Sequence, residues 1–164
     1  MRQTASQPTP TGARSTIVPS ARSAFAFAAL LSAAILALLA IVNGYPLAFF
    51  DSADYIAMSF TFKPVIYRTM PYAVLIMPAH LQVSLWLVIA VQCVVSAWVI
   101  GVATRAFLPA TSPWIASLLV ALLSLLTALP WYTGQLMPDF LGGLLALCMA
   151  TLVFARVCLS LPER

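Results

Sequence analysis

Residues 24–42 read AFAFAALLSAAILALLAIV, nineteen consecutive residues without a charged side chain. As a helix, a run of this length crosses roughly 30 Å of membrane hydrocarbon. The rest of the chain has the same character, because 63% of its 164 residues are hydrophobic and only 7% are charged. Soluble globular domains do not have this composition. The sequence therefore predicts an all-α protein that crosses a membrane several times.

Three further apolar segments complete the predicted membrane domain. They are residues 82–104, 111–129 and 140–158, which gives four transmembrane helices within residues 24–158. The first segment is long for the core of a signal peptide, which favours an uncleaved anchor. Residues 1–23, rich in Ser, Thr, Pro and Arg, are predicted to be a disordered cytoplasmic tail. Residues 159–164 are predicted to be a second, short cytoplasmic tail.

The positions of the basic residues predict the orientation. With the N-terminus inside, six of the eight Lys and Arg residues are cytoplasmic: Arg2, Arg14, Arg22, Arg105, Arg156 and Arg164. Only Lys63 and Arg68 then lie outside, in agreement with the positive-inside rule. The localisation predicted is a bacterial inner membrane with both termini in the cytoplasm. Because the basic residues form no patch, the net charge of +4 does not indicate a nucleic-acid partner.

Three of the four acidic residues fall on the predicted outer face. Asp51 and Asp54 belong to the loop of residues 43–81, and Asp139 directly precedes the fourth span. An ordinary role for Asp51 or Asp139 is to cap a helix N-terminus. The three cysteines give no alternative site, because they lie in apolar stretches without metal-ligand spacing.

The first outer loop is too hydrophobic to be a simple solvated connection. In FFDSADYIAMSF, residues 49–60, apolar residues recur every three or four positions, as expected of an amphipathic helix in the membrane interface. Its apolar face carries Phe50, Ala53, Ile56, Ala57 and Phe60. A second short helix is predicted at MPYAVLIMPAHL, residues 70–81, with Pro71 near its start. The loop is thus predicted to hold one or two interfacial helices.

Cations and phenols follow the two aspartates in this loop. Lys63, Tyr67, Arg68 and Tyr72 occur within KPVIYRTMPY, residues 63–72. Carboxylates, cations and phenols at a membrane surface suit a ligand with a phosphate and a polyhydroxylated group. The same residues also suit interfacial anchoring, with Lys and Arg at lipid phosphates and Tyr in the aromatic belt. The residues alone leave both interpretations open.

The order of these features resembles the amino-terminal part of the GT-C superfamily of integral membrane glycosyltransferases. The resemblance rests on a first span, an acid at the start of an interfacial helix in FFDSADYI, the segment YRTMPY, and a pair of helices joined by a short loop. The segment LPWYTGQLMPDFLGGLLAL, residues 129–147, is similar to stretches in bacterial multi-pass proteins of that type. The nearest branch is the mannosyltransferase-like and aminoarabinose-transferase-like one, which uses polyprenyl-phosphate sugar donors.

The resemblance implies roles for particular residues. Asp51 matches the candidate catalytic base, Arg68 the ligand of the donor phosphate, and Lys63 a second phosphate ligand. Asp54 matches less well, because the family often places its second acid adjacent to the first. Tyr72 and Asp139 are further candidates for substrate binding on the same face. No cofactor is required, although Asp51 and Asp139 have oxygen ligands suitable for a shared divalent cation.

Enzymes of this superfamily have many more spans, so the chain is interpreted as a fragment or a reduced paralogue. The expected partners are membrane lipid and a polyprenyl-phosphate sugar. The alternative is a non-enzymatic membrane protein that acts as a subunit, with a protein partner or a second copy packed at Ser96, Gly101, Gly142 and Gly143. A transporter is disfavoured, because no span has an ionisable residue at its centre.

Overall fold

The computed structural model describes residues 21–80, 83–155 and Leu159, and these residues form helices joined by short connections. The elements in order are α1 Ala21–Asn43, α2 Ser52–Thr61, α3 Met70–His80, α4 Trp86–Phe107, α5 Trp114–Leu126, α6 Leu129–Gly134 and α7 Asp139–Phe154. The all-α prediction is therefore confirmed for the described part of the chain. The predicted tails of residues 1–23 and 159–164 lie outside it, except for residues 21–23 and Leu159.

Two helices are long and apolar enough to cross a membrane. They are α1, over Arg22–Asn43, and α4, over Trp86–Phe107, with 22 residues each. At about 1.5 Å per residue, each reaches about 33 Å. The predicted boundaries shift slightly: α1 includes residues 21–23, and α4 begins at Trp86 after a turn at Val83. The helix begins three residues before the apolar run, because backbone hydrogen bonds do not require apolar side chains.

The third predicted span is interrupted. The helix α5 has 13 residues, and Thr127, with extended backbone, ends it. Pro130 lies in the first turn of the separate helix α6. Proline fits there because the first backbone N–H groups of a helix have no helical partner. The helix α7, Asp139–Phe154, has 16 residues and begins one residue before the fourth predicted span, whose end at residues 156–158 is outside the described residues.

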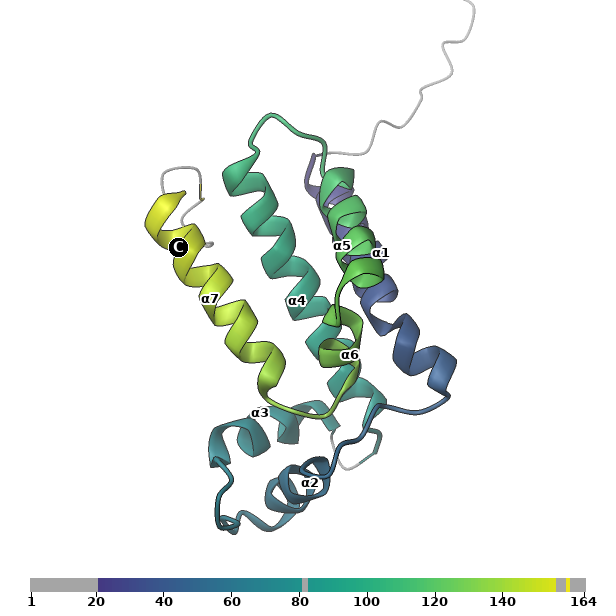
Figure 1. Cartoon of the computed structure of the whole chain (residues 1–164), viewed down its shortest axis with the longest axis vertical. Helices are drawn as coiled ribbons and strands as arrows, with labels where there is room; N and C mark the ends of the chain where they lie inside the picture. The colour runs from purple at the N-terminus through teal and green to yellow at the C-terminus, as the bar shows by residue number, and fades with distance from the viewer. Residues whose placement is uncertain (1–20, 81–82, 156–158, 160–164) are drawn as a thin grey trace, which may run out of the picture.

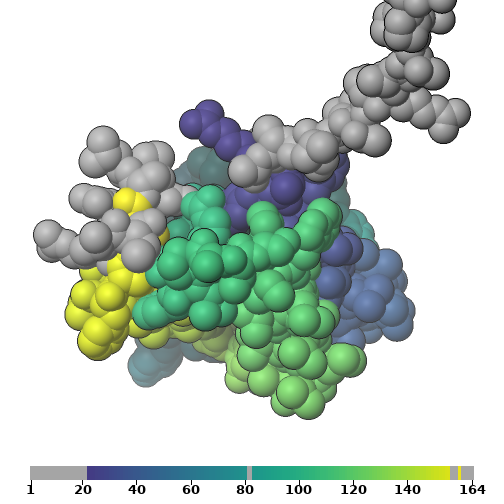
Figure 2. All heavy atoms as spheres, turned by 90° about the horizontal axis from the view of Figure 1, so that it is seen from above, coloured from purple at the N-terminus to yellow at the C-terminus, as the bar shows by residue number. Residues whose placement is uncertain are grey.

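The long helices form a bundle, and the short helices α2 and α3 close one end of it (Figure 1). The helix α1 packs against α4, α5 and α6, while α4 also packs against α7. At the closed end, α2 packs on α3, and α3 packs on α4. Viewed from the opposite end, α7 and the green segment of α5 and α6 lie on different sides of the loop that follows α4 (Figure 2).

A short backbone bridge fastens the loop after α1 to the connection between α6 and α7. The Leu47 N–H donates to the Gly134 carbonyl at 3.0 Å, and the Leu136 N–H donates to the Leu47 carbonyl at 3.0 Å. These bonds satisfy backbone groups that would otherwise be buried without partners, since Leu47 and Leu136 are both buried. The start of α2 is thereby held close to the start of α7.

The helix α2 has the two faces that its sequence predicts. Its buried face carries Ser52, Tyr55, Met58 and Ser59. The opposite side exposes the predicted apolar face, with Phe50 at 84% exposure and Phe60 at 46%. The apolar face therefore points outward instead of packing in the protein, which is what a helix lying in a membrane interface requires.

Candidate functional site

Arg68 stands at the centre of a charged cluster between the starts of α2 and α3. Its Nη2 forms an ion pair with Oδ1 of Asp51, seventeen residues earlier in the chain. Its Nε lies 3.4 Å from Oδ2 of Asp54, which is one turn into α2. Its Nη1 donates to the Tyr67 carbonyl at 3.4 Å. One guanidinium thus faces two carboxylates, and the three side chains together carry one net negative charge.

This cluster is partly open to solvent. The side chains of Arg68, Asp51 and Asp54 are 23%, 19% and 39% exposed. Water and salt screen the interactions of such partly exposed charges less than those of fully exposed charges, but more than those of buried charges. A ligand can therefore reach the cluster without the unfolding of either helix.

Two local backbone features direct Asp51 and Arg68 toward each other. Asp51 has the N-cap position of α2, but its carboxylate makes no capping hydrogen bond, so it is available to Arg68. The turn before the helix is closed instead by Ser52, whose Oγ accepts from the Phe49 N–H at 2.9 Å. Phe62 and Tyr67, at the two ends of the following loop, have φ values of 54° and 72°. Left-handed backbone at bulky residues is strained, and strain of this kind concentrates at functional segments.

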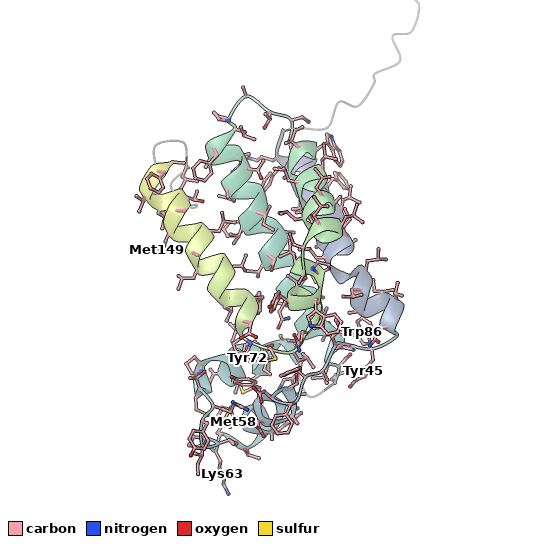
Figure 3. All side chains as sticks on the ribbon, in the orientation of Figure 1. Tyr45, Met58, Lys63, Tyr72, Trp86 and Met149 are labelled. Atoms are coloured by element: carbon pink, nitrogen blue, oxygen red, sulfur yellow. The ribbon has the colours of Figure 1, made fainter. Side chains whose placement is uncertain are left out.

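Lys63 is not part of this cluster. It lies in the loop between α2 and α3, is exposed, and points away from the body of the protein (Figure 3). The second predicted phosphate ligand therefore reaches the site only if this loop changes conformation.

Tyr72 lies in α3 and is only 2% exposed. Its hydroxyl donates to Oε1 of Gln92 at 2.7 Å, and its ring meets Tyr55 edge-on at a centroid distance of 5.1 Å. Burial, with Tyr55 and Asp139 nearby, raises the pKa of Tyr72 well above the ordinary tyrosine range. In this structure the phenol packs between α2–α3 and the bundle (Figure 3). Contact between Tyr72 and a substrate stays a prediction, and it requires this packing to open.

Gln92, in α4, connects Tyr72 of α3 to the backbone at the end of α6. Besides accepting from Tyr72, its Nε2 donates to the Thr133 carbonyl at 3.1 Å and to the Gln135 carbonyl at 2.9 Å. These carbonyls need a donor because they lie where α6 ends and the chain runs on to α7. Gln92 is a buried glutamine within an apolar helix, and its interhelical hydrogen bonds are those expected of such a residue.

Asp139 is the first residue of α7, but Pro138 has the N-cap position and Asp139 makes no capping hydrogen bond. The capping prediction for Asp139 is therefore wrong, although a carboxylate in the first turn still complements the helix dipole. Asp139 also lines a cavity of about 380 Å³ between α4, α5, α6 and α7. Apart from Asp139, Tyr132 and a few Ser and Thr side chains, this cavity is lined by apolar groups such as Leu123, Leu144 and Leu147.

The structure thus brings Asp51 and Arg68 together and adds Asp54, to which the sequence assigned no role. A one-turn spacing between Asp51 and Asp54 in a predicted helix is the signal that both face one partner. Within the described ranges, no three or more His, Cys, Asp or Glu side chains are grouped to hold a metal ion. A divalent cation shared by Asp51 and Asp139 stays a prediction.

Comparison of the chain with protein-family models, with curated proteins and with solved structures finds no match. The function therefore has to be inferred from the residues and geometry of the chain itself.

Proposed function

We propose that this chain is a GT-C-like inner-membrane protein that binds a polyprenyl-phosphate-linked sugar at its outer face. The observation that carries the proposal is the pairing of Arg68 with Asp51. These are the two residues to which the resemblance assigns the donor phosphate and the catalytic base. Asp51 directly precedes α2 and Arg68 precedes α3, and these two helices hold them at the end of the bundle where Asp139 also begins α7.

The proposed topology has four crossings with both termini in the cytoplasm. The helices α1 and α4 cross alone, and α5 with α6 makes the third crossing. The fourth is α7. In support, the start of α1 and the end of α7 lie at the same end of the bundle, opposite α2 and α3 (Figure 1). With this orientation Arg105 lies on the cytoplasmic side, whereas Lys63 and Arg68 lie outside.

The chemistry proposed is the transfer of the sugar to a hydroxyl group. The acceptor oxygen attacks the anomeric carbon, the bond from that carbon to the phosphate oxygen breaks, and polyprenyl phosphate leaves with the bonding electrons. Arg68 stabilises the negative charge of the leaving phosphate. Asp51 takes the proton of the acceptor hydroxyl. Arg68 is suited to its role because a guanidinium offers two parallel N–H groups to a phosphate.

The cavity beside Asp139 supports a lipid-linked ligand. Its volume of about 380 Å³ lies within the range of small-molecule sites, and most of its lining is apolar. Its polar groups include Asp139, at the end of the bundle that carries Arg68. An apolar chain with a charged head at that end matches this distribution. Tyr72 has a structural role in the proposal, since its contacts with Tyr55 and Gln92 hold α2 and α3 against α4, and Arg68 lies between α2 and α3.

The test is equilibrium binding of undecaprenyl phosphate to the full chain in nanodiscs. Removing the guanidinium in Arg68→Ala removes charge-assisted hydrogen bonds, so binding should weaken by about ten- to a hundredfold. Arg105→Ala is the matched control, because it removes the same charge at the other end of the bundle and should leave binding unchanged. Lys63→Ala measures whether the second candidate contributes at all. Undecaprenol, which lacks the phosphate, should bind equally to all variants.

The alternative function is that of a non-enzymatic subunit, and one observation favours it. A Cβ added at Gly142 or Gly143 would meet no neighbouring heavy atom of the described residues within 4 Å, so this part of α7 is open to a partner helix. Equal binding of undecaprenyl phosphate by the parent chain and Arg68→Ala would refute the donor site and leave this alternative.

A further inference from the structure

The cavity between α4, α5, α6 and α7 contains a buried hydroxyl group without a partner among the described residues. This hydroxyl belongs to Ser96 of α4, which lines the cavity and is only 1% exposed. The hydroxyls of Thr127 and Thr133 also line the cavity, but they donate to helix carbonyls at 2.6 and 3.1 Å. Because a buried polar group without a hydrogen bond costs free energy, Ser96 indicates a partner from outside the chain.

Asp139 is the charged residue of the same cavity, and it also lacks a partner of opposite charge. Within residues 21–80, 83–155 and Leu159, the ion pairs are those of Arg68 with Asp51 and Asp54. The carboxylate of Asp139 does not cap α7 either. The cavity therefore has a negative group that no cation of the described chain compensates.

The level of Asp139 in the bundle follows from the contacts of Gln92. Gln92 donates to the Gln135 carbonyl at 2.9 Å, and it lines a second cavity together with Phe140, the residue after Asp139. Gln92 lies six residues, or about 9 Å, inside the start of α4 at Trp86. With the proposed topology, Asp139 is therefore within the depth of the membrane. Ionisable groups at that depth pair with a group of opposite charge or line a polar path.

We propose that this cavity binds an amphiphile with an ammonium head, which donates to the Asp139 carboxylate and to Oγ of Ser96. An ammonium group has three donors and no acceptor, which matches a carboxylate and an unpaired hydroxyl. Asp139 and Leu147 are eight residues apart on α7, so the lining extends about 12 Å along the helix and can hold an alkyl chain. The site rests on the proposed topology but not on the proposed donor, because Arg68 and Asp51 do not line the cavity.

The test is saturable binding of radiolabelled dodecylammonium to the full chain in phosphatidylcholine nanodiscs, with empty nanodiscs as the blank. Asp139→Asn should weaken binding about three- to tenfold, between the values typical of exposed and of buried charged hydrogen bonds. Asp139→Glu keeps the charge and should lose less. Asp54→Asn is the matched control, because it removes the same charge outside the cavity and should leave dodecylammonium binding unchanged.

Ser96→Ala tests the second contact. It should weaken dodecylammonium binding about two- to fivefold without lowering the melting temperature, because the hydroxyl that it removes has no partner among the described residues. A Ser96→Ala variant that melts at a lower temperature and binds dodecylammonium like the parent would remove Ser96 from the site.

A ligand with the same chain and a neutral head tests the role of the charge. Dodecanol should bind the parent more weakly than dodecylammonium does, and about equally to the parent and Asp139→Asn. Equal binding of dodecylammonium by the parent and Asp139→Asn would overturn the ammonium site. Equal affinities of the parent for dodecanol and dodecylammonium would overturn it as well.

Phosphatidylethanolamine added to the nanodiscs distinguishes two sources of the ammonium group. If it displaces dodecylammonium, the site takes a lipid head group, and if it does not, the site takes a free amphiphilic amine. The variants also separate this site from the donor site. If undecaprenyl phosphate binds equally to the parent and Arg68→Ala while Asp139→Asn weakens dodecylammonium binding, the proposed donor fails and the ammonium site stands.

Discussion

At the scale of single residues, the hydrogen bonds of Gln92 show how much a polar side chain in an apolar helix organises. It accepts from Tyr72 and donates to two backbone carbonyls, so one side chain joins α3, α4 and the connection from α6 to α7. A lone glutamine in an apolar helix is expected to have interhelical partners. The sequence does not predict which ones, because these depend on where α6 ends.

The raised pKa of Tyr72 gives a prediction about alkaline stability. Its burial favours the neutral phenol, so an unfolded chain loses this proton at a lower pH than the folded chain. The stabilisation is therefore fully present below the ordinary tyrosine pKa of about 10 and is lost as the pH rises above it. In Tyr72→Phe, this part of the alkaline loss should be absent. The measurement is the free energy of unfolding in detergent between about pH 8 and pH 11.

At neutral pH the same substitution has a separate cost. Oε1 of Gln92 would remain buried without its donor, so Tyr72→Phe should be less stable than the parent by about 1–2 kcal/mol. Tyr132→Phe is the control, because that tyrosine is about half exposed. An identical alkaline slope in the parent chain and Tyr72→Phe would contradict the assigned burial effect.

For the charged cluster, the sequence could predict which residues matter but not how they pair. Asp51 and Arg68 were identifiable because acids are scarce and both residues lie in one unusually apolar loop. The ion pair itself was not identifiable, because it requires the strained loop between Phe62 and Tyr67 to turn the chain back. The exclusion of Lys63 has the same cause, since residues of one loop need not point in one direction.

At the scale of elements, the sequence predicted α2 from its apolar spacing and α3 from the apolar segment that Pro71 begins, but it did not predict the way they pack. The recurrence of apolar residues every three or four positions identified both faces of α2. The structure buries the face with Tyr55 and Met58 and exposes the face with Phe50 and Phe60. Periodicity alone cannot distinguish a face that packs on protein from one that meets lipid, because both are apolar. Similarly, hydropathy could not locate the interruption between α5 and α6, because the residues around Thr127 are as apolar as the helices.

The glycines of α4 and α7 give a prediction about helix packing. A Cβ added at Gly101 would lie 3.1 Å from the Phe25 ring, whereas one at Gly142 would meet none of the described neighbours within 4 Å. Gly142→Ala should leave stability unchanged or raise it by up to about 1 kcal/mol, because alanine is the better helix former. Gly101→Ala should be less stable than Gly142→Ala by about 1 kcal/mol or more, because the Phe25 ring must move within a packed contact.

The cost at Gly101 has a second source, since the Phe25 ring also holds the Arg105 guanidinium 4.3 Å from its centroid. Thermal unfolding of both variants in one detergent provides the comparison. Equal melting temperatures for Gly101→Ala and Gly142→Ala would mean that α1 and α4 do not pack closely at this point.

At the scale of the whole molecule, the number of membrane crossings depends on the shorter helices. With 13 residues, α5 reaches only about 20 Å, which is less than the roughly 30 Å of hydrocarbon. The six residues of α6 add about 9 Å. At the interruption, the Thr127 N–H donates to the Leu123 carbonyl at 2.9 Å and the Leu129 N–H donates to Oγ1 of Thr127 at 3.2 Å, while Gln92 and Leu47 bond the backbone where α6 ends. Interrupted helices are tolerated at membrane depth when neighbouring groups satisfy the backbone in this way.

This reasoning predicts which loops are accessible from each side of the membrane. In a chain whose native cysteines are replaced, Lys63→Cys should react with a membrane-impermeant maleimide in intact cells, because the proposed topology puts the loop between α2 and α3 outside. Ala110→Cys, in the exposed loop between α4 and α5, should react only after the membrane is permeabilised. Tyr132→Cys, in α6, should react from the outside if α5 and α6 together complete the third crossing. Reaction of Ala110→Cys in intact cells would reverse the orientation, and reaction of Tyr132→Cys only after permeabilisation would mean that α5 and α6 return to the cytoplasmic side without crossing.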